Sequence, residues 1–186
     1  MKIKKHQAGF GAVVAGLVLF SNKIKMPKGD KIRKMATSSL KMKLYMLKEL
    51  PLGALTGLNV EEIDREHARV SVPFKRLNKN PFRSMYFAVL SMAAELSSGI
   101  LALALVSDAP QPVSMLVLEM KGSFSKKART KVHFICEDGK KIERAIHESL
   151  KTGDGKTVEV STVGFDEEGD EVARFVFTWT FKPKAK

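Results

Sequence analysis

The chain has 186 residues, of which 44% are apolar, and a formal net charge of +12 from 32 Lys and Arg against 20 Asp and Glu. This length and composition favour one domain with a real hydrophobic core plus an extension, and argue against two domains. Residues 1–50 hold 12 of the basic residues and 2 of the acids, so the remainder is close to neutral. The basic excess therefore belongs to an N-terminal arm, and nothing indicates a nucleic-acid partner for the domain.

The cysteine and histidine content supports neither a disulfide framework nor a metal site. Cys136 is the only cysteine, which excludes an intramolecular disulfide and a thiolate cluster and is typical of a reducing compartment. The histidines show no metal-ligand spacing; they are His6, His67, His133 and His147. We therefore expect no metal, no cofactor and a cytoplasmic location.

The first 30 residues form the predicted arm. Lys2–His6 is basic and Gly9–Phe20 is apolar, as in a signal sequence, but no small-x-small cleavage pattern follows. The apolar run is also too short to span a bilayer, which takes about 20 residues. Two alternatives stay open: a short interfacial anchor, or a translation start placed too far upstream, with Met26 or Met35 as the true initiator.

The segment Asp30–Leu50 follows a helical period and is predicted to form one basic amphipathic helix, which Pro51 and Gly53 end. Its apolar stripe lies away from its lysines and comprises Ile32, Ala36, Leu40, Leu44 and Leu47. Such a helix more often packs its stripe on its own domain than on a membrane, so we favour packing. Peripheral contact of residues 1–50 with an anionic membrane is the alternative.

Four extended runs are predicted as strands. Leu58–Ile63 and Ala68–Phe74 flank a polar cluster and indicate a hairpin, because alternate residues of the second run are apolar. Val113–Met120 is almost continuously apolar, which predicts a strand covered on both faces. Arg129–Glu137 alternates, with one apolar face made of Val132, Phe134 and Cys136.

A short helix and a second hairpin complete the chain. Gly139–Leu150 has apolar residues at helical spacing, and Gly153 follows it. Thr157–Phe165 and Glu171–Phe181 flank an acidic turn, and the second run turns an aromatic face inward: Phe175, Phe177, Trp179 and Phe181. Since strands occur in runs and do not alternate with helices, we predict an α+β fold: an antiparallel sheet around one long helix, with an extra N-terminal helix.

The long helix is predicted over Met85–Ser107. Pro81 stops any earlier helix and Ser84 is a good N-cap residue directly before the apolar run. The run is long enough to cross a bilayer, but Glu95 lies in its middle and alternating strands lie on both sides. We therefore interpret it as the core helix that the sheet wraps.

Glu95 is the single charge in that helix. An ionised carboxylate in apolar surroundings is costly unless it is paired, hydrogen-bonded or facing a wet cleft, so it should face something polar. Two interpretations stay open: a structural carboxylate held by a neighbouring backbone or hydroxyl group, or a functional one.

Three stretches carry a family resemblance: Asn80–Phe87 (Asn-Pro-Phe-Arg-Ser-Met-Tyr-Phe), Ala93–Gly99 (Ala-Ala-Glu-Leu-Ser-Ser-Gly) and Phe177–Pro183 (Phe-Thr-Trp-Thr-Phe-Lys-Pro). Over roughly Lys31–Pro183 the chain resembles a hotdog family labelled only as a domain of unknown function, within the hotdog superfamily of acyl thioesterases. In that superfamily a sheet wraps one long helix and subunits pair. The resemblance implies a single hotdog domain over residues 31–186 that forms a homodimer or a dimer of dimers.

The resemblance also implies site residues. In the phenylacetyl-CoA thioesterase branch the helix start reads Asn, two residues, Gly, two residues, His-Gly-Gly, with an acid nine residues after the His. Here Asn80 and Glu95 match, Tyr86-Phe87-Ala88 replaces His-Gly-Gly, and Arg83 stands at the first Gly. This implies catalytic roles for Glu95 as base or nucleophile, Asn80 as orienting group and Tyr86 as donor in place of His.

The substrate-binding residues implied by the resemblance lie at the helix start, within the helix and on a basic turn: Phe87, Ala88, Ser98, Lys126, Lys127 and Arg129. The backbone of the first two would polarise a thioester carbonyl, and the basic side chains would meet the phosphates of coenzyme A. Phe87 and Ala88 add side chains where glycine would let a thioester approach closely, which favours altered or lost access. A solvated turn is the alternative for the basic residues.

Three functions follow as hypotheses. The first is a homodimeric enzyme that hydrolyses acyl-CoA thioesters at the subunit interface, and the second is a non-catalytic hotdog module that binds an acyl chain or an acyl carrier. The third is a membrane-associated protein anchored by its basic arm. The sequence has no phosphate-binding glycine loop and no Gly-x-Ser-x-Gly elbow, which argues against nucleotide hydrolysis and serine-hydrolase chemistry.

Overall fold

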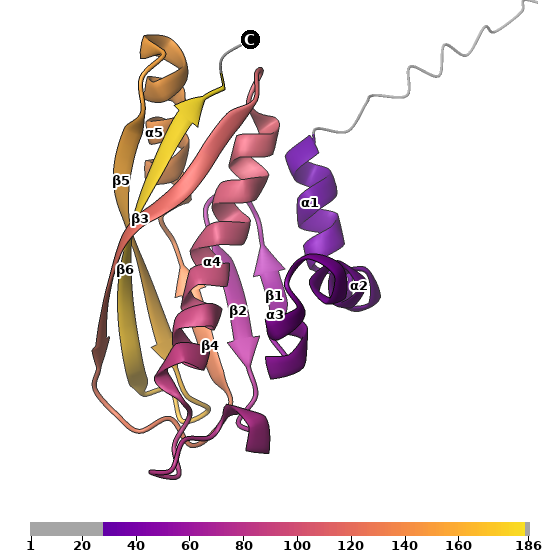
Figure 1. Cartoon of the computed structure of the whole chain (residues 1–186), viewed down its shortest axis with the longest axis vertical. Coiled ribbons are helices and arrows are strands. Elements are labelled where there is room, and N and C mark those ends of the chain that lie inside the picture. The colour runs from indigo at the N-terminus through magenta and orange to yellow at the C-terminus, as the bar shows by residue number, and fades with distance from the viewer. Residues whose placement is uncertain (1–27, 185–186) are drawn as a thin grey trace, which may run out of the picture.

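The strands form one antiparallel sheet in the order β1-β2-β4-β5-β6-β3, in a computed structural model that describes residues 28–184 (Figure 1). The strands are β1 Asn59–Ile63, β2 Ala68–Val72, β3 Val113–Phe124, β4 Val132–Cys136, β5 Lys156–Phe165 and β6 Glu171–Pro183. The helices are α1 Lys28–Ala36, α2 Ser39–Glu49, α3 Pro51–Thr56, α4 Phe87–Asp108 and α5 Gly139–Thr152, with a short 3-10 turn at Arg76–Asn78. The predicted α+β class with an antiparallel sheet around a long helix is confirmed.

The hydrophobic core lies between the inner face of the sheet and α4. The predicted alternation holds in β4, where Val132, Phe134 and Cys136 are fully buried, and in β6, whose aromatic residues all face inward. Helix α4 contacts β2, β4 and β5, and α5 packs against α4, β5 and β6. α4 is long and apolar enough to cross a bilayer, yet 67% of its apolar window is buried inside the fold, as expected of a core helix.

The N-terminal helices cover α4 on its other side. Figure 1 shows α1, α2 and α3 grouped beside α4 and β1, and α1 contacts both of them. Gly29 lies against the Ala104 carbonyl, and its N–H donates to the Asp108 carboxylate at 2.9 Å. The nearly buried Arg33 donates to the same carboxylate at 3.0 Å. α1 therefore seals the C-terminal half of α4.

The prediction of one helix over residues 30–50 is wrong. The chain breaks after α1 at Thr37 and Ser38, where Ser38 is extended, and α2 starts in a new direction. Because the helix is interrupted here, the 3.6-residue period of α1 does not carry over into α2, and the predicted apolar stripe does not match the buried face of α2. Consequently Met42 and Met46 are the buried residues of α2, while Leu40, Leu44 and Leu47 are 60–70% exposed. Pro51 does not end the helical region either, because it begins α3, where its missing N–H costs nothing.

The predicted start of α4 is two residues early. Met85 donates its N–H to the Ala128 carbonyl at 2.8 Å, and Tyr86 donates to the Asn78 carbonyl at 2.7 Å. These contacts keep the chain extended through Tyr86, so Tyr86 takes the N-cap position that was assigned to Ser84, and the helix runs from Phe87 to Asp108.

Strand β3 is not covered on both faces. It is an edge strand that pairs only with β6, and most of its residues after Val113 are exposed. Its exposed apolar side chains are Leu116, Leu118, Met120 and Phe124. An apolar run has the same composition whether the chain's own layers cover it or leave it open, which is why the prediction was wrong.

Candidate functional site

The loop before α4 is closed by the Asn80 side chain. Its Oδ1 accepts from the backbone N–H groups of Phe82 at 3.0 Å and Ser84 at 3.2 Å, and its Nδ2 donates to the Ser84 hydroxyl at 3.1 Å. In the same loop Arg83 has a φ of 59°, the left-handed conformation that glycine adopts most easily. Arg83, which stands at the first Gly of the thioesterase pattern, therefore adopts a conformation that glycine favours.

The first turn of α4 presents free backbone N–H groups. The Tyr86 carbonyl accepts from the N–H groups of Val89 at 3.0 Å and Leu90 at 3.3 Å. Within residues 28–184 the N–H groups of Phe87 and Ala88 have no acceptor. Free donors at a helix N-terminus carry the positive end of the helix dipole, so this turn can stabilise a developing oxyanion.

Aromatic side chains crowd this turn. The Phe87 ring makes edge contacts with Tyr86, at 5.0 Å between centroids, and with Phe124 of β3 at 6.4 Å. Phe124 in turn contacts the buried Phe175. The Tyr86 and Phe87 rings are about half exposed, so they narrow the approach to the free N–H groups without sealing it.

An open pocket of about 310 Å³ lies at the same turn. It brings together four of the residues expected from the sequence, Asn80, Phe87, Lys126 and Lys127, and it also includes Leu90 and Phe124. The basic turn after β3 thus lies beside the start of α4.

Lys126 is held by acids of the β5–β6 hairpin. Its Nζ lies 2.8 Å from Asp166, 2.7 Å from Glu168 and 2.6 Å from Asp170, and these carboxylates raise the pKa of the lysine. The ammonium occupies the space between the three carboxylates, whose oxygens lie close enough together to hold a metal ion. Lys126 therefore fixes the turn, and the exposed Lys127 and Arg129 are the basic groups left to meet a phosphate.

Glu95 lies two turns further along α4, beside Gly99 and Trp179. Burial raises the pKa of its carboxyl, and no donor or cation among the described residues offsets that effect. Of the three ways to satisfy the Glu95 carboxylate that the sequence left open, pairing and hydrogen bonding are not seen among the described residues, and facing an open cleft remains.

The Glu95 carboxyl lines an open and mainly apolar pocket of about 310 Å³ between α3 and α4. One side of the pocket comes from the segment between the end of α2 and the residues after α3, and the other side comes from α4. The lining residues are Glu49, Leu50, Pro51, Leu52, Gly53, Leu58, Met92, Glu95 and Leu96. The size is at the lower end of small-molecule pockets, and the apolar lining suits a hydrocarbon chain.

Asn80 and Glu95 do not meet in one subunit. They line separate pockets, and eight residues of helix, about 12 Å at 1.5 Å per residue, separate Phe87 from Glu95. Ser98 is also set apart, because it is fully buried and its hydroxyl donates to the Glu95 carbonyl at 3.1 Å and accepts from the Trp179 indole at 3.2 Å.

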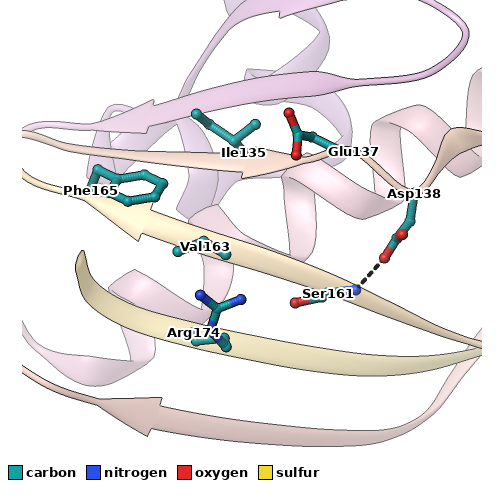
Figure 2. Close-up of a pocket in the computed structure, with 7 residues that line it drawn as sticks. All are labelled: Ile135, Glu137, Asp138, Ser161, Val163, Phe165 and Arg174. Carbon is teal, nitrogen blue, oxygen red and sulfur yellow. Dashed lines mark hydrogen bonds between the residues drawn. The ribbon is translucent and has the colours of Figure 1, made fainter. Parts of the chain in front are cut away.

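A further pocket, of about 360 Å³, lies on the outer face of β4, β5 and β6 (Figure 2). Its polar groups are largely used within the fold, since Asp138 accepts from the Ser161 N–H at 2.8 Å and Arg174 pairs with Glu171. It contains none of the residues that the sequence singled out.

Sequence reasoning missed the apolar partners of Glu95 and the role of Gly99. A Cβ on Gly99 would lie 2.9 Å from the Glu95 carboxylate, so this glycine makes room for the acid. Helical spacing could have found it, because Ala88, Met92, Glu95 and Gly99 fall on one face of α4. No local pattern points to Leu50 or Leu52.

Comparison with known proteins identifies the family of this chain. Residues 40–181 match the model of a family described as Domain of unknown function (DUF4442). The chain belongs to this family. A search of the curated proteins found no match.

Solved structures with the same fold include proteins described as thioesterases. A Pseudomonas aeruginosa protein called a probable thioesterase shares 21% identity over 78% of this chain and 96% of its own, with a TM-score of 0.66. A protein of unknown function from Chlorobaculum tepidum shares 14% identity over 85% and 98%, with a TM-score of 0.69. A Haemophilus influenzae thioesterase shares 12% over 77% and 90%, with a TM-score of 0.55. The chain therefore shares the fold of these proteins, which is the hotdog fold.

Proposed function

We propose that this protein hydrolyses acyl thioesters of coenzyme A or of an acyl carrier, with Glu95 as the general base. The observation that carries the proposal is an unpaired, largely buried carboxylate on the wall of an apolar pocket. A carboxylate whose pKa is raised by burial is a stronger base than one in water, once it has lost its proton. The thioesterase descriptions of the structural neighbours support the same reaction class.

The proposed chemistry uses Glu95 and the free N–H groups at the start of α4. Glu95 takes a proton from water as the water oxygen attacks the thioester carbonyl carbon, and the negative charge develops on the carbonyl oxygen. The N–H groups of Phe87 and Ala88 stabilise that oxyanion. The oxyanion then collapses to the carboxylic acid and the carbon–sulfur bond breaks, while the proton held by Glu95 passes to the leaving sulfur and regenerates the carboxylate. Lys127 and Arg129 hold the phosphates of a coenzyme A leaving group.

This chemistry requires two subunits. One carbonyl cannot reach both groups of the same α4, since about 12 Å of helix separates them. Edge strand β3 offers the pairing surface, because its 12 residues pair on one side only and carry exposed apolar side chains. We therefore include a homodimer in the proposal, in which Glu95 of one subunit works with the first turn of α4 in the other.

A second function is favoured by one specific observation, the Tyr86 and Phe87 rings over the first turn of α4. If these rings keep the thioester carbonyl away from the free N–H groups, the protein binds an acyl thioester without hydrolysing it. The two functions share the pocket and differ only in turnover.

The deciding experiment measures hydrolysis and binding for a panel of acyl-CoA chain lengths. We expect Glu95→Gln to lower kcat/KM by at least about 100-fold, the scale of general-base catalysis, while ligand binding by calorimetry persists. Glu148→Gln, an exposed glutamate on α5, is the matched control and should retain wild-type rates. Equal rates in wild type and Glu95→Gln would reject Glu95 as the base. Binding by the wild type without turnover would select the second function.

A further inference from the structure

Helix α2 carries two apolar stripes, and only one of them is buried. Met42 and Met46 face the core, whereas Leu40, Leu44 and Leu47 are 70%, 60% and 63% exposed. The three leucines have the spacing i, i+4, i+7, so they form one continuous stripe along the outer side of the helix.

The exposed stripe continues along the chain beyond α2. Leu50, Leu52 and Leu55, in and next to α3, are 42%, 64% and 56% exposed. Single exposed leucines are ordinary, but six within sixteen consecutive positions, on and next to two helices that contact each other, are a concentration of exposed apolar side chains of the kind that marks an interaction site. We call these six residues the leucine surface.

Lysines border this surface. At 100° per residue, Lys43 lies on one side of the α2 leucine stripe and Lys41 and Lys48 lie on the other, and all three are exposed. Over residues 28–50 the chain holds seven Lys and Arg against two acids. Leucines flanked by long basic side chains match a bilayer interface, where the leucines enter the acyl region and the ammonium groups reach anionic headgroups.

We propose that the leucine surface docks on an anionic membrane. A second copy of the chain is the less suitable occupant, because a two-fold contact would place the lysine borders of both copies against each other. At an anionic membrane, by contrast, each Lys or Arg close to the membrane surface adds to the attraction.

Docking has a consequence that rests on the proposed thioesterase function. Leu50 and Leu52 belong both to the leucine surface and to the pocket that Glu95 lines. A docked protein would therefore take up an acyl chain directly from the bilayer, and its substrates would be long-chain acyl thioesters that partition into membranes.

The first test is co-sedimentation of the full chain with vesicles of phosphatidylcholine alone or mixed with phosphatidylglycerol. We expect binding to the mixed vesicles that weakens with salt, and a loss of at least tenfold in Leu40→Gln/Leu44→Gln/Leu47→Gln. Because these side chains are exposed, the variant should keep its thermal unfolding midpoint.

The control for charge replaces three lysines by glutamate on α2 and, in a separate variant, three lysines by glutamate on α5. Lys41→Glu/Lys43→Glu/Lys48→Glu should lose binding, and Lys140→Glu/Lys141→Glu/Lys151→Glu on α5 should lose clearly less. Wild-type binding by the leucine variant, equal losses in the two lysine variants, or no binding by the wild type would overturn the proposal. A leucine variant that binds vesicles normally but sediments as a smaller oligomer would assign the surface to a second copy.

The consequence is tested by comparing a long-chain acyl-CoA presented in vesicles with a soluble short-chain acyl-CoA. The α2 leucine variant should lose turnover of the first and keep turnover of the second. Absence of turnover with both substrates in the wild type would reject the thioesterase function and leave the vesicle-binding result standing.

Discussion

The two halves of α4 have similar composition and different surroundings. The C-terminal half, from Ile100 to Asp108, packs against the sheet and against α1, and we call it the closed end because Asp108 anchors α1 through Gly29 and Arg33. The N-terminal half buries one face and leaves another partly open at Ala88, Ser91, Met92 and Glu95. The proposed site lies in this N-terminal half, the open end, to which α1 is not anchored. The Asp108 carboxylate at the closed end is paired, whereas the Glu95 carboxyl at the open end has no partner among residues 28–184.

The largest expected effect comes from removing the ion pair at the closed end of α4. Asp108→Ala removes one of the two carboxylates, Asp30 and Asp108, that pair with the nearly buried Arg33, and it also removes the acceptor of the Gly29 N–H. We expect a loss of about 3 kcal/mol in the free energy of unfolding, as for other broken buried pairs, measured by urea denaturation. Lys48→Ala breaks an exposed pair with Glu49 and should cost less than about 0.5 kcal/mol. Similar losses in both variants would contradict the role assigned to Asp108.

A smaller effect is expected where the two halves meet. Ser98→Ala removes the acceptor of the buried Trp179 indole N–H, which should cost about 2 kcal/mol in unfolding free energy. Ser91→Ala, which removes a hydroxyl bonded only to the Phe87 carbonyl on the open face, is the control and should be nearly neutral. If Ser98→Ala instead weakens acyl-CoA binding without loss of stability, Ser98 contacts the ligand.

The closed parts of the fold were the predictable ones. In β4 and β6 one buried face imposes alternation on the sequence, so residues such as Phe134 and Trp179 reveal both the strand and its inner side. The helical break at Thr37 and Ser38 was not predictable, because it depends on where α1 docks on α4 and no proline or glycine marks it.

The site was predictable only in part. Glu95 is conspicuous as one charge in an apolar run, and its helical neighbours follow from spacing alone. Its apolar wall comes from Leu50 and Leu52, which approach α4 through the tertiary fold, and the exposed side of β3 has the composition of a buried strand. An exposed apolar surface leaves no local pattern that distinguishes it from core.

Gly99→Ala tests whether the position of the Glu95 carboxylate at the open end of α4 matters for activity. Its new Cβ would lie 2.9 Å from the Glu95 carboxylate, which must move, whereas alanine favours the helix by about 1 kcal/mol over glycine. We expect kcat/KM to fall about tenfold with the unfolding free energy unchanged or raised. Gly155→Ala, at an exposed position with room for a Cβ, should change neither quantity. Wild-type rates in Gly99→Ala would show that the position of the carboxylate does not matter.

The smallest effect tests the unpaired charge itself. Burial raises the pKa of Glu95 in the folded state above its ordinary value of 4.5, so the unfolded chain releases the proton first as pH rises. Folding stability is therefore lost from about pH 4.5 upward until the folded-state pKa is passed. Glu95→Gln removes this loss and should raise the unfolding free energy at pH 8 by about 1 kcal/mol, with little difference at pH 4.

The control for that comparison is Glu148→Gln, which should leave unfolding curves unchanged at both pH values because this glutamate is exposed. Thermal unfolding across this pH range supplies the measurement. If Glu95→Gln is instead less stable than the wild type at pH 8, the carboxylate has a partner in solution, and a donor from a second subunit at the open end of α4 is the first to look for. In that case the same variant should dissociate more readily on dilution, which gel filtration would detect.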